Sequence, residues 1–380
     1  FGGGGIHINR VNVSDAMLHI AAEPGEYPTN LERMFRMPAQ TETPEPGPEI
    51  FRIRKVRIRN FRFRLSNFME ALSVYPGYGI NYDDIDLTAD INGHSLRFSG
   101  GRMYGVADKV TLTEKSGYRL LRASGRCVAG QGKTLVENFR LLDPWSKLNV
   151  KSFSMTYDSP AAFNNFIEEV LMECELRRSE IGVPTLKYLA GMADGIDARL
   201  DVRGCRFKGY VNDFRFDGLN FTDMASGVSG EIGGDAIGLP DIGRMMASLK
   251  IKDLEFDSAG LTSMLSQWLP DAGLPDLSEY APGVRFSLDA DIEGPPDRLR
   301  LDALLHSSAG DIRIGTDIRN LMDSSRGIEI SGVLDTYGLG LGSIVPGLPF
   351  GDCTLEARAS ARLDNGMSRI RIDTLGISSV

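Results

Sequence analysis

The sequence has no run of about 20 consecutive apolar residues, the length that a membrane-spanning helix requires. Its start, Phe1 followed by four glycines, has neither the basic region nor the apolar region of a secretory signal. We therefore expect a piece of a longer protein whose targeting segment lies elsewhere.

Cysteine and histidine are scarce, with four of each in 380 residues. The cysteines form no Cys-x-x-Cys pair, which removes support for a zinc or thioredoxin-like site and favours small buried side chains; they are Cys127, Cys174, Cys205 and Cys353. The histidines match no metal-ligand spacing and stand at positions 7, 19, 94 and 306. No Gly-x-Ser-x-Gly elbow and no phosphate-binding glycine loop is present. The sequence predicts no enzyme, no cofactor and no metal site.

Positive charge is in deficit, because the formal net charge is −9. A phosphate backbone needs a basic face with stacking aromatics, so we expect no nucleic-acid partner. Hydrophobic residues make up 42% of the chain, which is enough for a folded protein with a substantial core.

One pattern recurs along the chain: two alternating apolar residues, two polar or small residues, then two more alternating apolar residues. Val56-Arg57-Ile58-Arg59-Asn60-Phe61-Arg62-Phe63 is an example. The other copies span 6–13, 80–87, 148–155, 200–207, 214–221, 249–256 and 370–377. Alternation places each apolar pair on one face of a strand, but the two-residue interruption would turn the next pair outward. A β-bulge restores the facing and bends the strand.

The fold class that follows is mostly β. We expect an elongated, curved trough, like a β-taco or a β-helix, with an apolar inner face and two or three short helices. Thirteen residues at the apolar positions are predicted to line this groove: Phe51, Ile53, Ile58, Phe61, Phe63, Leu87, Val150, Phe153, Phe216, Ile251, Leu254, Leu301 and Ile372.

Two segments have the apolar spacing of a helical face, 160–171 and 259–269. Each precedes a proline-led turn, near 183–188 and 274–280, and this order predicts an internal duplication and equivalent helices. We divide the chain into N-terminal strands at 1–147 with a mobile loop at 38–49, a first repeat at 148–245, and a second repeat with further strands of the same trough at 246–380.

Charged side chains offer alternative sites. The carboxylates beside the strands have the chemistry for glycoside hydrolysis or calcium binding; they are Asp83, Asp84, Asp86, Asp197, Asp201, Asp289 and Asp291. An arginine ladder has the chemistry to bind lipid head groups or sugars and comprises Arg52, Arg54, Arg57, Arg59, Arg62 and Arg64. We interpret both sets as the water-facing side of a large sheet.

Several stretches resemble the bacterial TamB proteins and the wider AsmA-like family. They are the run from Leu148 to Tyr188, the segments 195–200 and 214–219, and the phrase Gly238-Leu239-Pro240-Asp241-Ile242. The similarity covers most of the chain. It lies in the large periplasmic portion that precedes the family's C-terminal domain.

The resemblance implies a periplasmic β-taco in a protein anchored to the inner membrane by a segment not present here. Members of the family are linked to phospholipid movement between the membranes and to outer-membrane biogenesis. The implied partners are phospholipid acyl chains and, through regions outside this sequence, an outer-membrane barrel of the Omp85 type. The family has no catalytic residues to transfer. Two alternatives remain: a structural periplasmic spacer with a filled core, and a β-helical protein that binds or cleaves carbohydrate.

Overall fold

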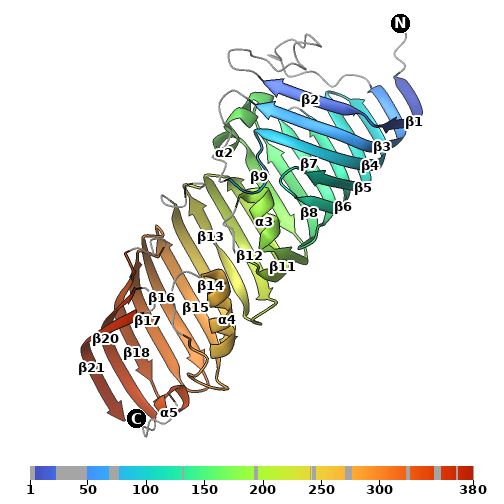
Figure 1. Ribbon diagram of the computed structural model, residues 1–380. Helices are drawn as coiled ribbons and strands as arrows, with labels where there is room; N and C mark the ends of the chain where they lie inside the picture. The colour runs from blue at the N-terminus through green and yellow to red at the C-terminus, as the bar shows by residue number, and fades with distance from the viewer. Residues whose placement is uncertain are drawn as a thin grey trace. The chain divides into compact units, whose positions relative to one another are not determined.

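The computed structural model (Figure 1) describes residues 5–22, 49–67, 77–130, 132–191, 196–239, 241, 245–269, 276–321, 326–345, 352–364 and 367–379. The chain divides into two compact units, residues 1–195 and 196–380. Both are mostly β, as predicted, with a few short helices. Within the described ranges, no helix is long and apolar enough to cross a membrane.

The first unit is a sheet in which most neighbouring strands are antiparallel. Strand β3 pairs with β4, and the pairing continues in sequence order through β9, while β10 pairs with β8. Strands β1 and β2 both run parallel to β3. The strands are β1 (Ile6–Ser14), β2 (Met17–Ala22), β3 (Glu49–Asn67), β4 (Asp84–Ser99), β5 (Arg102–Glu114), β6 (Arg119–Gly130), β7 (Lys133–Leu142), β8 (Lys147–Thr156), β9 (Leu171–Leu176) and β10 (Ser179–Gly182).

The second unit is an antiparallel meander from β11 to β18, extended by β20 and β21. The short strand β19 pairs with β20 beside β18. The strands are β11 (Arg199–Tyr210), β12 (Asp213–Asp223), β13 (Ser229–Ile237), β14 (Met246–Asp257), β15 (Arg285–Gly294), β16 (Arg298–Ser307), β17 (Asp311–Arg319), β18 (Ile328–Tyr337), β19 (Leu339–Gly340), β20 (Asp352–Asp364) and β21 (Met367–Ser379).

Bulges interrupt the strands where the apolar pattern changes phase. Asn60 in β3, Gly218 in β12 and Asp253 in β14 have φ values of +49°, +63° and +47°. At each of them the pairing register with a neighbouring strand shifts. The predicted bulges are therefore confirmed at these positions, and the extra residue lets apolar side chains on both sides of it face the same way.

An aspartate on the adjacent strand holds two of these bulges. The Asn60 N–H donates to Asp90 Oδ1 at 2.8 Å, and the Asp253 N–H donates to Asp289 Oδ1 at 3.0 Å. A bulged residue drops out of the regular ladder, so its N–H needs another acceptor. The same hydrogen bond occurs in both units, so Asp289 has a structural role.

In the described ranges, four short α-helices and one 3₁₀ helix lie between the strands: η1 (Pro160–Asn165), α2 (Phe166–Glu169), α3 (Val183–Ala190), α4 (Ser258–Trp268) and α5 (Leu341–Ile344). Helix α4 confirms the prediction for 259–269, and its N-cap Asp257 accepts the Gly260 N–H at 2.7 Å.

The predicted helix at 160–171 is wrong at its last two residues, Val170 and Leu171. Residues 160–169 form η1 and the single turn of α2, and the chain is extended at Val170, where φ is −107° and ψ is 103°. Leu171 begins β9, which pairs with β8. The two predicted helices are therefore not equivalent.

Two further expectations need correction. The predicted proline-led turn near 183–188 is helix α3, with Pro184 in its first turn and Gly191 ending it in the left-handed conformation. The predicted strand at 80–87 begins only at Asp84. Before it, the Ile80 N–H donates to the Tyr188 carbonyl at the end of α3.

Some sequence-based expectations fall on other parts of the chain. The predicted loop at 38–49 lies outside the described residues except for Glu49, which begins β3. The turn near 274–280 is described only from residue 276. The three-part division at 147/148 and 245/246 stays a prediction.

Candidate functional site

Apolar residues of the first unit form a row across its strands. Ile58 opposes Ile91, which opposes Val110, and the row continues through Ala123 to Leu141. Directly opposed residues project from the same face of a sheet. Ala123 is buried and the others are half-buried. We call these five residues the first row.

The second unit contains a corresponding row. Ile251, Ala290, Ala303, Ile314 and Leu334 oppose one another in turn from β14 to β18. The two alanines are buried, with 5% and 8% exposure, and the larger side chains are half-buried. We call these residues the second row.

Two of the thirteen predicted groove residues belong to these rows, and the others lie elsewhere on the strands. Ile58 and Ile251 belong to them, and Phe63 opposes Leu87. The remaining residues oppose apolar partners as follows: Phe51 with Phe98, Ile53 with Leu96, Phe61 with Ala89, Val150 with Phe139, Phe153 with Val136, Phe216 with Phe207, Leu254 with Leu288, Leu301 with Ile292 and Ile372 with Ala359.

Exposure separates these residues into groups. Val150 and Leu254 are buried at 7% exposure each, Ile372 on β21 is 56% exposed, and the others are half-buried. Their charged neighbours Arg57 and Lys151 are exposed, in keeping with the predicted alternation. That all these apolar residues share one continuous face stays a prediction.

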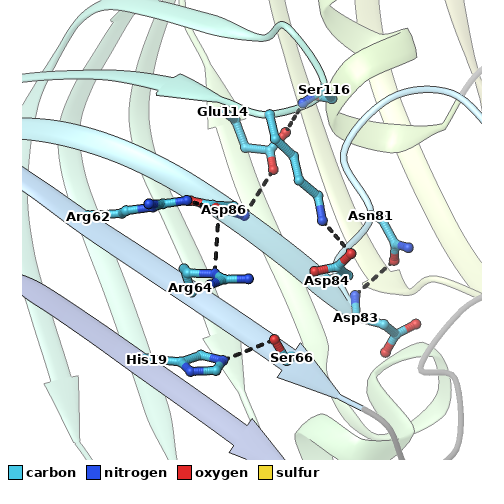
Figure 2. A network of polar contacts seen from close by, with 11 residues as sticks. His19, Arg62, Arg64, Ser66, Asn81, Asp83, Asp84, Asp86, Glu114 and Ser116 are labelled. Carbon is cyan, nitrogen blue, oxygen red and sulfur yellow. Dashed lines mark hydrogen bonds and ion pairs between the residues drawn. The ribbon is translucent and has the colours of Figure 1, made fainter.

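The polar side of β3 and β4 carries matched charges, as Figure 2 shows. Arg62 Nη2 donates to Asp86 Oδ2 at 2.6 Å, and Arg64 Nε lies 3.4 Å from the same oxygen. The hydrogen bond from Arg62 is the main reason that the pKa of Asp86 lies below its usual range. Lys115 forms an ion pair with Asp84. This end of the arginine ladder is compensated by neighbouring carboxylates.

Two other carboxylates of the alternative site, Asp83 and Asp291, also have local partners. Asp83 Oδ1 accepts a hydrogen bond from Asn67 Nδ2 at 3.0 Å, and Asp291 lies 3.7 Å from Lys250 Nζ. In the part of the chain that the structure describes, no group of three or more His, Cys, Asp and Glu residues is placed to hold a metal ion. The cysteines are all free, and only Cys353 has the buried position expected of them.

Sequence reasoning missed a set of buried carboxylates at the hairpin turns. Glu114, Asp143 and Asp223 are 3%, 3% and 0% exposed. Each accepts a hydrogen bond from the backbone N–H two residues further on. The available signal was an acidic residue at a strand end followed within three residues by serine, which is typical of turns that bond to their own backbone.

Asp143 forms the most extensive of these networks. Its Oδ1 accepts the N–H groups of Trp145 and Ser146 at 2.8 and 2.6 Å. Its Oδ2 accepts the hydroxyls of Thr185 at 2.8 Å and Tyr118 at 3.3 Å. This carboxylate therefore fastens α3, through Thr185, to the turn between β7 and β8.

Comparison of the chain with models of protein families, with curated proteins and with solved structures finds no match.

Proposed function

We propose that this chain is a periplasmic segment of a TamB- or AsmA-like protein and holds or conducts phospholipid acyl chains along its apolar rows, in support of outer-membrane biogenesis. The observation that carries the proposal is that the large side chains of both rows are half-buried. In a filled core, such side chains would be closely packed on every side.

The largest fully buried side chains lie outside the rows, although Val110, Ala123 and Leu141 of the first row share one hydrophobic cluster. Within the described ranges, these largest side chains are Val170, Val183, Val202, Val228, Thr185, Asp223 and Ser146, and most of these stand at turns and helix ends. No leucine, isoleucine or phenylalanine is among them. The largest fully buried side chains thus stand mostly near the ends of strands and helices, whereas the half-buried members of the rows keep some apolar surface that a ligand can cover.

Acyl chains suit such a surface. Burying hydrocarbon contributes about 0.8 kcal/mol per CH₂ group, while the head group stays in water. Similar apolar residues recur from strand to strand, so successive positions would bind an acyl chain with similar affinity and movement would need no chemical step. In this proposal the inner-membrane anchor and the contact with an Omp85-type barrel belong to other parts of a longer protein.

Photo-crosslinking in a Gram-negative periplasm tests the proposal. A benzoylphenylalanine at position 91 replaces a first-row isoleucine, and the same residue at position 57 replaces an exposed arginine on β3. We expect phospholipid adducts, identified by mass spectrometry, at position 91 and few at position 57. Equal adduct formation at both positions, or none at position 91, would contradict lipid binding. Either result would favour the alternative of a structural spacer with a filled core.

A further inference from the structure

Strand β21 carries four exposed apolar side chains on one face. Within the described ranges, β21 pairs only with β20, so its other edge has no partner strand. The register with β20 shifts at Asp373, and the bulge there lets the apolar residues on both sides of it face the same way. The four residues are Ile370, Ile372, Leu375 and Ile377, and their exposed fractions are 71%, 56%, 51% and 53%.

Leu375 continues the second row. Leu334 on β18 opposes Ala357 on β20, and Ala357 in turn opposes Leu375. Leu334 has paired strands on both sides and is half-buried, whereas Leu375 has a paired strand on one side only and is exposed. A further strand beside β21 would therefore cover Leu375 in the way that the neighbouring strands cover Leu334.

Strand β21 lacks several features by which soluble proteins protect the edge of a sheet. Such edges are typically very short, or they carry proline, lysine or a charge that points toward the apolar side. β21 has 13 residues, contains neither proline nor lysine, and has no charged residue among its four apolar-face positions. Its bulge does not prevent pairing, because the bulged strands β12 and β14 have partners on both sides. The free edge of β21 is therefore suited to pairing with another strand.

The apolar residues of β21 are complementary to a second copy of the same strand. Their spacing of two, three and two residues is the same in both directions along the strand. In an antiparallel pair of two such strands, Ile370 would oppose Ile377 of the other copy, and Ile372 would oppose Leu375. A register shifted by two residues would set an apolar residue against the polar bulge, so the sequence specifies one register.

The charges of β21 fit the same register. Arg371 would oppose Gly376 of the other copy, and Arg369 would oppose Ser378. Like charges in directly opposed positions destabilise a sheet, and no like charges would be directly opposed in this pair.

We propose that β21 pairs antiparallel with β21 of a second copy of this chain, around a twofold axis perpendicular to the sheet. Such a contact uses one surface twice, which is the commonest arrangement of a dimer. The axis leaves the apolar faces of both copies on the same side. Strand β1 offers a smaller uncovered surface, because Ile6 is 63% exposed but Val11 and Val13 are half-buried. The pairing does not depend on lipid binding.

Gel filtration with light scattering, together with sedimentation velocity, tests the pairing. The interface variant is Ile372→Lys, and the matched control is Ile6→Lys, which places the same charge on an exposed isoleucine of the other unit. Because Ile372 is exposed, the lysine stays hydrated in a monomer and the fold is kept, which circular dichroism verifies. We expect the wild type and the control to be dimers. The dissociation constant of the interface variant should rise at least about a hundredfold, because the twofold axis introduces the charge twice.

Disulfide trapping tests the register. The single variants Ile372→Cys and Leu375→Cys are mixed and oxidised, and mass spectrometry identifies the linked peptides. Directly opposed residues have Cβ atoms about 4.5–5.5 Å apart, close to what a disulfide needs, whereas diagonal neighbours are about 7–8 Å apart. We therefore expect this mixture to be trapped efficiently and a mixture of Ile370→Cys with Leu375→Cys to be trapped poorly. A monomeric wild type, oligomers that Ile6→Lys dissociates, or equal trapping of the two mixtures would overturn the proposal.

Discussion

At the scale of single residues, we expect the buried turn carboxylates to contribute strongly to the free energy of unfolding. Asp143→Ala removes the acceptor of two backbone N–H groups and two hydroxyls. Buried donors left without an acceptor lower stability, so we expect a loss of about 3 kcal/mol in the free energy of unfolding, measured in urea. Asp108→Ala is the control, since that side chain is 55% exposed and lies 3.5 Å from His94 Nε2. Equal losses would contradict the role of Asp143.

Because of Tyr118, we expect the free energy of unfolding to depend on pH. Burial, the charge of Asp143 and the hydrogen bond to Asp143 raise the pKa of Tyr118 above its ordinary value of 10.0. As the pH rises past that value, the unfolded chain loses the phenolic proton and the folded protein keeps it. The free energy of unfolding therefore falls from the ordinary pKa toward the raised one.

Urea unfolding between about pH 8 and pH 11 checks this dependence around the reference pKa of tyrosine. We expect a steeper fall at high pH for the wild type than for Tyr118→Phe, which has no phenolic proton at this site. Identical pH profiles for the two proteins would show that the raised pKa contributes nothing to stability.

At the scale of elements, the bulges depend on residues that accept positive φ. Gly218 has φ +63° and empty space where a side chain would begin, so a substitution there reports backbone strain alone. We expect Gly218→Ala to cost about 1–2 kcal/mol and Gly218→Asn less, because asparagine tolerates the left-handed region. Gly233→Ala is the control, at a position without positive φ and with ordinary contacts. Denaturant midpoints that shift equally at both sites would contradict this account.

The elements differ in how far the sequence could predict them. Alternation and its interruptions predicted strands and bulges, because side-chain period and register are local properties of a strand. The apolar spacing at 259–269 predicted α4 for the same reason. Val170 and Leu171 were misassigned because they fit the apolar spacing of a helical face, whereas pairing with β8 draws the chain from Leu171 onward into a strand. The sequence did contain signals for α3, because Pro184 and Gly191 mark its two ends. We interpreted Pro184 as the start of a turn, which was wrong.

The candidate site, like the elements, could be predicted from the sequence only in part. Which residues share one face of a strand follows from alternation, so the choice of Phe63 and Leu87 as apolar-face residues was within reach of the sequence, whereas their direct opposition depends on the register between β3 and β4. The direct opposition of Arg52 and Arg97 was not within reach, because it depends on the register between β3 and β4. The arginine ladder alone did not reveal that Arg62 and Arg64 share the carboxylate of Asp86.

The decisive prediction for the whole molecule concerns a charge placed among the apolar residues. Leu254 is unsuitable because it is 7% exposed and opposes Leu288, so a charge there destabilises a groove and a filled core alike. Phe63 is half-buried and opposes Leu87 on one side and Leu18 on the other. In an open groove, Phe63→Glu stays hydrated, so the melting temperature changes little while co-purified phospholipid, measured by mass spectrometry, falls.

A filled core gives the opposite result for the same substitution. The glutamate would be buried without a partner, which costs several kcal/mol, and there would be no bound lipid to lose. Arg59→Glu on the exposed side of β3 controls for the change of charge and should alter neither quantity. A large drop in melting temperature with unchanged lipid content would rule out the groove, because the side chain that should touch the acyl chain would then be touching only protein.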